Sequence, residues 1–352
     1  MNFGICVSQG DRSTLSLAAS ETSCPATRSR LAICCWLAMP SLVLLPALLA
    51  GCDSENGAAA DGRFHINSDL MVVPVVGTTA STETVTYVPD AADAESAALS
   101  ISGLPSGVHA TFAPASVDAS SPSSTLHLGA DAGVADGAYP VVIVATSRTQ
   151  NASVPVTVWV VRNPGMTLGF GAELQTPTAG SYLAPFYVGV VDGAGNPPPA
   201  GTSVTLAVRP QAYQKGRMTF NGSQWAPTYA ISSSDADFDS FGCMNEDTNS
   251  NGNLDPGEDY NNNMQLDPVS SVSLPTSTVI ADTSGYAESG MTYSRQEARW
   301  LSASLTATLS GTTLSLVETL VLPALGDDET GSDPPPDAIS PFGTASNCGT
   351  PN

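Results

Sequence analysis

Residues 153–161 read Ser-Val-Pro-Val-Thr-Val-Trp-Val-Val and place a valine at every second position. In an extended strand, successive side chains point to opposite faces, so Val154, Val156, Val158 and Val160 share one face. Seven short segments of this β-rich kind occur in the first globular stretch, with Gly, Pro and Asp turn signals between them. They are residues 71–76, 82–88, 97–104, 109–114, 124–130, 138–147 and 153–161. This number of strands in one stretch predicts an all-β fold, a two-layer sandwich.

The composition agrees with short strands joined by turns. The 352 residues include 31 Gly and 27 Pro, and only 12% are charged, which argues against long surface helices. Lys and Arg number 11 against 33 Asp and Glu, giving a net charge of −22. Phosphate binding needs clustered Lys and Arg, so nucleic acid is not expected as a partner.

The first predicted domain, residues 66–163, carries a more specific pattern. Gly103-Leu104-Pro105-Ser106-Gly107-Val108, followed by Phe112-Ala113-Pro114, resembles the "GLPxGV…FxP" signature of immunoglobulin-like modules repeated in secreted bacterial proteins. Asp136-Gly137-Ala138-Tyr139-Pro140 is similar to a turn and strand of the same modules. The resemblance implies an immunoglobulin-like β-sandwich with a spacer or adhesive role.

A second predicted domain covers residues 166–325. Its run Val190-Val191-Asp192-Gly193-Ala194-Gly195-Asn196-Pro197 resembles bacterial Ig-like group 1 domains, the modules of invasin and intimin stalks. Asp282–Ala287 is similar to another turn of that family, in altered form. The predicted fold class is therefore all-β, with two immunoglobulin-like β-sandwich domains in tandem. An acidic insertion, at about residues 211–275, interrupts the second.

The insertion contains a patterned run of acidic and amide side chains. Residues 235–267 hold nine acids and no Lys or Arg, and residues 247–258 fit D-x-[DN]-x-[DN]-G-x₅-E at every defined position. Calcium requires several oxygen ligands that converge on one point, and Gly252 permits the sharp turn that this needs. The expected calcium ligands are Asp247, Asn249, Asn251, Asn253 through its carbonyl, Asp255 and Glu258. The alternative is a disordered acidic linker.

The pattern recurs twelve residues later as a possible second, weaker loop. Its candidate ligands are Asp259, Asn261, Asn263, Gln265 and Asp267. Met264 replaces the loop glycine, and Ser270 stands where the closing glutamate is expected. The tandem spacing resembles dockerin and thrombospondin type 3 calcium loops more than paired helical EF-hands.

The N-terminal region predicts export and lipid anchoring. The apolar run 31–49 ends in Leu49-Ala50-Gly51-Cys52, which resembles the lipobox of bacterial lipoprotein signal peptides. That resemblance implies a signal peptide at 1–51, lipidation of Cys52, a flexible tether at 52–65 and attachment to a membrane of the bacterial cell envelope. The alternative is a plain N-terminal membrane anchor.

Two cysteines, Cys243 and Cys348, remain after the signal peptide and the lipidated residue are set aside. An oxidising compartment favours a disulfide between them, and two free thiols are the alternative. Cys348 lies in an acidic, Pro-rich tail, residues 326–352, that has too few apolar residues to fold alone.

No catalytic constellation is recognisable, since HExxH, Walker A and G-x-S-x-G motifs are all absent. The favoured function is a non-catalytic envelope lipoprotein with structural or adhesive Ig-like modules stabilised by calcium. The alternative is a carbohydrate-binding or accessory subunit of a secreted hydrolase or pilus system, with Trp225, Tyr229 and Tyr260 as a candidate aromatic platform. The expected partners are the membrane and either another envelope protein or a glycan.

Overall fold

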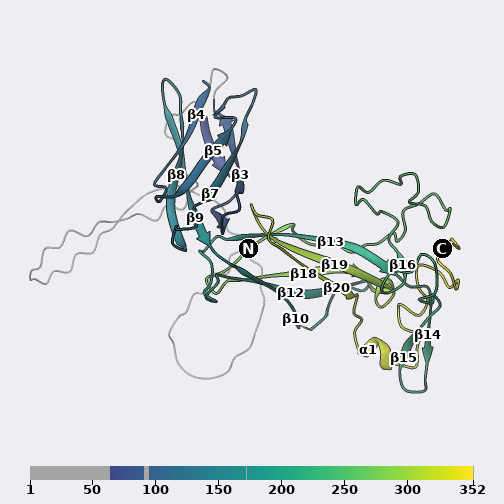
Figure 1. Cartoon of the computed structure of the whole chain (residues 1–352). Coiled ribbons are helices and arrows are strands. Elements are labelled where there is room, and N and C mark those ends of the chain that lie inside the picture. Colours follow the sequence, from purple (N-terminus) through teal and green to yellow (C-terminus); the bar gives the residue numbers. More distant parts are fainter. Residues whose placement is uncertain (1–63, 91–94, 172, 352) are drawn as a thin grey trace, which may run out of the picture. The chain divides into compact units, whose positions relative to one another are not determined.

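The computed structural model describes residues 64–90, 95–171 and 173–351 (Figure 1). The predicted signal peptide, Cys52 and nearly all of the tether lie outside these residues. The described chain contains β-strands β1 to β20, one short helix, α1 (Asp327–Thr330), and one 3-10 turn, η1 (Arg295–Glu297). The predicted all-β fold class is confirmed. No helix in these ranges is long and apolar enough to cross a membrane.

The first domain consists of two sheets. One sheet is antiparallel throughout and has the order β1 (Phe64–Ser68), β3 (Ser81–Pro89), β7 (Ser123–Ala130), β5 (Val108–Ala113). The other has the order β2 (Val72–Val76), β9 (Asn151–Val161), β8 (Gly137–Thr146), β4 (Ala97–Ser102), β6 (Ser116–Val117). Within this second sheet only β2 and β9 run parallel. The two sheets form the predicted sandwich.

Alternating burial along the strands builds the core of this domain. In β3, Val85 and Tyr87 are buried while Thr86 between them is half-buried, and Phe64 of β1 stacks on Tyr87 with ring centroids 4.9 Å apart. In β9, Val156, Val158 and Val160 are buried as the alternation predicts. The sequence reading missed β1 and β6, because β1 lies among polar residues and β6 has only two residues.

The second domain is also a two-sheet structure. Its first sheet centres on β12 (Ser181–Val191), which pairs with three strands: β10 (Gly165–Phe170), β11 (Gln175–Thr178) and β18 (Tyr286–Ser294). Its second sheet contains β16 (Cys243–Met244), β13 (Ser203–Tyr213), β19 (Leu301–Leu309), β20 (Ser315–Val321) and β17 (Thr278–Ile280). Buried side chains of β12 and β19 belong to one apolar core.

The insertion grows out of β13. It leaves the sheet at Tyr213, forms the hairpin β14 (Gly216–Phe220)–β15 (Trp225–Tyr229), and returns to the end of β13 through β16, where Tyr213 pairs with Cys243 (Figure 1). The two acidic loops follow β16, and the chain rejoins the sheet at β17. A single strand thus carries both ends of the insertion.

The tail, residues 326–351 of the described chain, is packed against the insertion. Main-chain bonds hold it in place: Met218 N–H donates to Ala338 at 2.8 Å, and Gly216 N–H donates to Gly343 at 2.9 Å. Phe342 is 3% exposed and packs on Tyr213 with ring centroids 5.0 Å apart. The few apolar residues of the tail thus complete a core that the insertion provides and do not form a core of their own.

The disulfide between Cys243 and Cys348 is confirmed, with the two Cα atoms 5.4 Å apart. Both cysteines are buried, at 1% and 3% exposure. The bridge joins the tail to β16, four residues before the first acidic loop. It thereby fixes the strand from which that loop departs.

Candidate calcium site

The first acidic loop is anchored to β13 by Asn245. The Asn245 N–H donates to the Gln211 carbonyl at 3.1 Å, and its Nδ2 donates to the Pro210 carbonyl at 2.7 Å. Its Oδ1 accepts from the N–H of Asp247 at 2.9 Å. The first predicted ligand is therefore held at a fixed position relative to the sheet.

Four of the predicted side chains in the first loop come together. Oδ1 of Asp247 and Oδ1 of Asn249 both accept from the N–H of Asn251, each at 3.0 Å. Oδ2 of Asp255 accepts from Nδ2 of Asn249 at 2.8 Å and from Nδ2 of Asn251 at 2.7 Å. Gly252, at φ +73°, makes the left-handed turn that closes this arrangement. Positions 1, 3, 5 and 9 of the motif thus converge, as the spacing predicts.

The side chains of Glu258 and Asn253 lie outside this converging group; for Asn253 the predicted ligand is the main-chain carbonyl and not the side chain. Glu258 is 4% exposed and binds main-chain donors of the loop, with Oε1 accepting from Thr248 N–H at 3.0 Å and Oε2 from Asp255 N–H at 3.0 Å. The side chain of Asn253 turns toward the Asn251 carbonyl, with Nδ2 at 3.1 Å, and does not join the converging group. Glu258 therefore ties the two ends of the loop together.

The second loop repeats this geometry. Asp259 and Asn261 accept from the N–H of Asn263 at 2.9 and 3.0 Å, and Asp267 accepts from Nδ2 of Asn261 and of Asn263 at 2.6 and 2.9 Å. At the glycine position, Met264 has φ +63°. The backbone turn is therefore kept without glycine, at a cost of about 1 kcal/mol for a side chain in this conformation. Of the predicted residues here, Gln265 contributes only its N–H, to Asn263 at 2.8 Å.

Glu246 performs in the second loop the role of Glu258 in the first, and the sequence reading missed it. Its Oε1 accepts from Tyr260 N–H at 3.0 Å, and its Oε2 accepts from Asp267 N–H at 2.9 Å. Ser270 does stand in place of a closing glutamate, but a glutamate upstream supplies the carboxylate. The signal was present in the sequence, because Glu246 and Glu258 each directly precede the first aspartate of a repeat. The first loop is thus held by its own Glu258, and the second by Glu246, which precedes the first loop in the chain.

The pKa is lowered for Asp255 and Glu258, which bond the first loop, and raised for Glu246, which bonds the second. Hydrogen bonds from Asn249 and then Asn251 lower the pKa of Asp255, and the N–H of Asp255 is the main cause that lowers the pKa of Glu258. Burial raises the pKa of Glu246, which is only 1% exposed, and the nearby charge of Asp267 raises it further. The lowered pKa values favour the ionised form of Asp255 and Glu258, whereas the raised pKa of Glu246 means that its ionised form is disfavoured unless a positive charge lies nearby.

The four converging side chains of each loop offer only oxygen atoms as metal ligands, two from Asp carboxylates and two from Asn carboxamides. Among the described residues, no group of three or more His, Cys, Asp and Glu side chains is placed to hold a metal ion by itself. A cation in the first loop would therefore depend on Asn249 and Asn251, whose carboxamide oxygens would have to replace Nδ2 at the centre of the loop. Carboxylate and amide oxygens are the ligands that Ca²⁺ uses in such loops.

The three aromatic residues considered as a sugar platform each make a different set of contacts. Trp225 packs on Phe220, and its Nε1 donates to the Gly331 carbonyl at 3.0 Å. Tyr229 lies edge-on to Trp300 with centroids 5.7 Å apart. Tyr260 belongs to the second acidic loop, where its N–H bonds Glu246. Packing and hydrogen bonding therefore account for Trp225 and Tyr229.

Comparison with known proteins gives only distant likenesses. No protein-family model and no curated protein matches the chain. Among solved structures, a chimeric titin Z1Z2 is 13% identical, with 74% of this chain and 97% of that chain covered and a TM-score of 0.20. An endo-fucoidan hydrolase of glycoside hydrolase family 107 is 10% identical, with 77% and 30% covered and a TM-score of 0.23. A Salmonella alpha-2-macroglobulin reacted with methylamine is 14% identical, with 77% and 15% covered and a TM-score of 0.21. At these scores the likenesses carry no argument about function.

Proposed function

We propose that this protein is a non-catalytic, lipid-anchored protein of the bacterial cell envelope, in which tandem Ig-like domains form a structural or adhesive module and calcium stabilises the insertion. The observation that carries the calcium part is that two loops of the same geometry each hold a buried glutamate on their main-chain N–H groups, Glu258 in the first loop and Glu246 in the second. The lipid anchor is supported by the Leu49–Cys52 sequence.

The burial of the loop carboxylates supports a bound cation. Glu246, Glu258 and Asp267 are 1%, 4% and 4% exposed. Buried charges in proteins are paired or coordinate metals, because an unpaired charge is costly to remove from water. Residues 235–267 provide no Lys or Arg, and the nearby Lys215 donates its ammonium group to the Thr350 carbonyl. Cations from solution would supply the missing positive charge.

Calcium suits the loops better than magnesium. Each loop offers several protein oxygens from side chains at alternate positions, whereas magnesium retains several of its waters and prefers few protein ligands. The replacement of Asp by Asn at two positions of each loop lowers the ligand charge and favours moderate affinity.

Calorimetry and thermal unfolding of the processed chain, residues 52–352 with Cys52→Ser, test the calcium part. We expect heat on addition of Ca²⁺ and a higher Tm, by at least the equivalent of about 1 kcal/mol when calcium is well above its Kd. Asp247→Ala should remove binding at the first loop, and Glu246→Gln should weaken the second. Glu318→Gln, at an exposed position of β20, is the matched control. Neither heat nor a change of Tm at millimolar Ca²⁺ would leave the insertion as a metal-free acidic segment.

The lipid anchor needs a separate test. Labelling of the full chain with an alkyne fatty acid in a bacterial host should place the label on Cys52, and Cys52→Ser should abolish it. Undiminished labelling of the variant would rule out Cys52 as the lipidated residue, without bearing on the calcium loops.

A further inference from the structure

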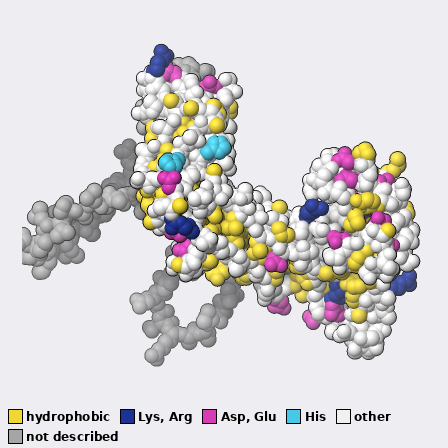
Figure 2. Space-filling model, viewed as in Figure 1, with side chains coloured by type: hydrophobic (Ala, Val, Ile, Leu, Met, Phe, Trp, Pro, Cys, Tyr) yellow, Lys and Arg dark blue, Asp and Glu magenta, His cyan; other side chains and the backbone are white. Residues whose placement is uncertain are grey.

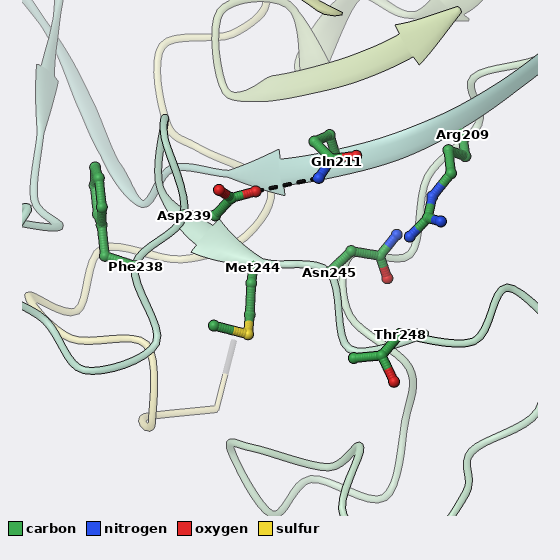
Figure 3. A pocket seen from close by; sticks show the side chains of 7 residues that line it. All are labelled: Arg209, Gln211, Phe238, Asp239, Met244, Asn245 and Thr248. Atoms are coloured by element: carbon green, nitrogen blue, oxygen red, sulfur yellow. Dashed lines mark hydrogen bonds between the residues drawn. The ribbon is translucent and has the colours of Figure 1, made fainter. Parts of the chain in front are cut away.

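A pocket of about 290 Å³ opens in the second domain, beside the start of the first acidic loop (Figure 3). It lies between the end of β13 and the segment that enters and leaves β16. Its lining residues include Arg209, Gln211, Phe238, Asp239, Met244 and Asn245. This volume is at the lower end of the range of small-molecule sites, about 300–1,000 Å³, so it suits one small ring system or two.

We propose that this pocket binds a neutral saccharide, as a terminal mono- or disaccharide unit of a glycan. The inference rests on the adhesive part of the proposed function and supplies a ligand class for it. It does not depend on the lipid anchor. It also relocates the expected sugar contact away from Trp225, Tyr229 and Tyr260.

One wall of the pocket presents donors and acceptors in fixed positions. Nε2 of Gln211 donates to Oδ2 of Asp239 at 3.2 Å, the bond drawn across the pocket in Figure 3. Oδ1 of Asp239 also accepts from Ser240 N–H at 2.6 Å, so the carboxylate is held from both sides. Oε1 of Gln211 and the second hydrogen on its Nε2 have no protein partner among the described residues. Sugar hydroxyls both donate and accept, which matches this mixture of groups.

Two apolar side chains, Phe238 and Met244, also line the pocket. Figure 3 shows the Phe238 ring at one end and the Met244 thioether projecting below the polar wall. A saccharide ring has a polar rim of hydroxyls and an apolar face of C–H groups. An aromatic ring and a polarisable thioether offer contact for that face, while the hydroxyls meet Gln211 and Asp239.

The charges select a neutral ligand. The pocket contains one cation, Arg209, and one anion, Asp239. Arg209 already donates to the side chain of Ser250 and, at 3.3 Å, to the carbonyl of Asp247, so part of its hydrogen-bonding capacity is used by the first loop. The chain carries a net charge of −22, with acidic side chains spread over the visible face of the second domain (Figure 2), which disfavours an anionic ligand. Within the pocket, Arg209 offsets the attraction that Asp239 exerts on a cationic ligand. Hydroxyl groups can bond both charged side chains without either conflict.

Saturation-transfer NMR of the processed chain against single sugars tests the proposal. The probes are D-glucose, D-galactose, D-mannose and N-acetyl-D-glucosamine with the disaccharides cellobiose, maltose, lactose and chitobiose. D-glucuronic acid and D-glucosamine are the charged counterparts. We expect at least one neutral sugar to give a signal at millimolar concentration or below, with weaker signals from the charged sugars.

Two conservative variants locate the site. Phe238→Leu keeps an apolar side chain but removes the ring, and Asp239→Asn keeps the shape but removes the charge; each should weaken binding roughly tenfold. Phe220→Leu, which removes an aromatic ring from β14 outside the pocket, should leave binding unchanged. Absence of any neutral-sugar signal from the folded protein would overturn the proposal. Binding that survives both pocket variants would also overturn it, by placing the sugar elsewhere. The calcium titration of the same protein has its own readouts, heat and Tm, so a failure of calcium binding and a failure of sugar binding are distinguished.

Discussion

Removal of the Cys243–Cys348 bridge should release the tail and destabilise the insertion. The bridge spans 105 residues, and a loop of this length is worth about 4.7 kcal/mol in the chain-entropy description, as an upper figure. The double variant Cys243→Ala/Cys348→Ala avoids leaving one unpaired thiol in the core. With an m-value of about 4 kcal/mol/M in guanidinium chloride, the midpoint of the transition that includes the insertion should fall by roughly 1 M.

Hydrogen exchange identifies the part of the molecule that responds. The N–H groups of Gly216 and Met218 donate to carbonyls of the tail, at Gly343 and Ala338, and should lose protection in the double variant. The N–H groups of β8 and β9 in the first domain should be unaffected and serve as the internal control. A loss of less than about 1 kcal/mol, with Gly216 and Met218 still protected, would refute the reasoning and show that packing alone holds the tail.

Three further predictions concern stability. Phe342→Ala should cost about 3 kcal/mol, measured by denaturant unfolding, because a buried ring on Tyr213 is lost, whereas Ile339→Ala in the same tail, at 64% exposure, should cost little. Gly242→Ala should destabilise by about 1–3 kcal/mol, since its Cβ would lie 2.1 Å from the Tyr213 carbonyl oxygen, while Gly171→Ala, with no atom within 4 Å, should be neutral. Burial raises the pKa of Glu83, so its folded state binds a proton more readily than its unfolded state, and wild-type stability should rise as pH falls through that raised pKa. Glu83→Gln should therefore have a higher free energy of unfolding than wild type at pH 7, and this difference should shrink in acid. A difference of the same size at pH 7 and in acid would contradict this.

Many of the strands could be predicted from the sequence, because buried and more exposed side chains alternate along them. Val156, Val158 and Val160 are buried as their alternation predicts. The loops were also readable, since fixed spacing brings Asp247, Asn249, Asn251 and Asp255 together. Non-local partners were not readable in the same way. Whether Phe342 is buried depends on Tyr213, far away in the chain, and no local pattern reports that contact.

The role of Glu246 was not predicted from the sequence, for a different reason. Its spacing was visible, but a motif that ends at its twelfth position directs attention downstream, to Ser270. The carboxylate that bonds the second loop instead comes from upstream, at Glu246, whereas Glu258 bonds the first loop, to which it belongs. The disulfide was predictable by elimination, since only two cysteines remain when the predicted signal peptide and Cys52 are set aside.

The position of Cys348 also sets an order of events during synthesis. Cys243 must wait for its partner, 105 residues later in the chain, which at about 5–20 residues per second takes roughly 5–20 s. During that interval Gly216 and Met218 have no tail carbonyls to bond, and Tyr213 has no Phe342 to cover it. The first domain has no such delay, because all its strands precede residue 162. The nascent protein thus passes through a stage with one finished domain and one open insertion, and in that stage the thiol of Cys243 is available to a wrong partner.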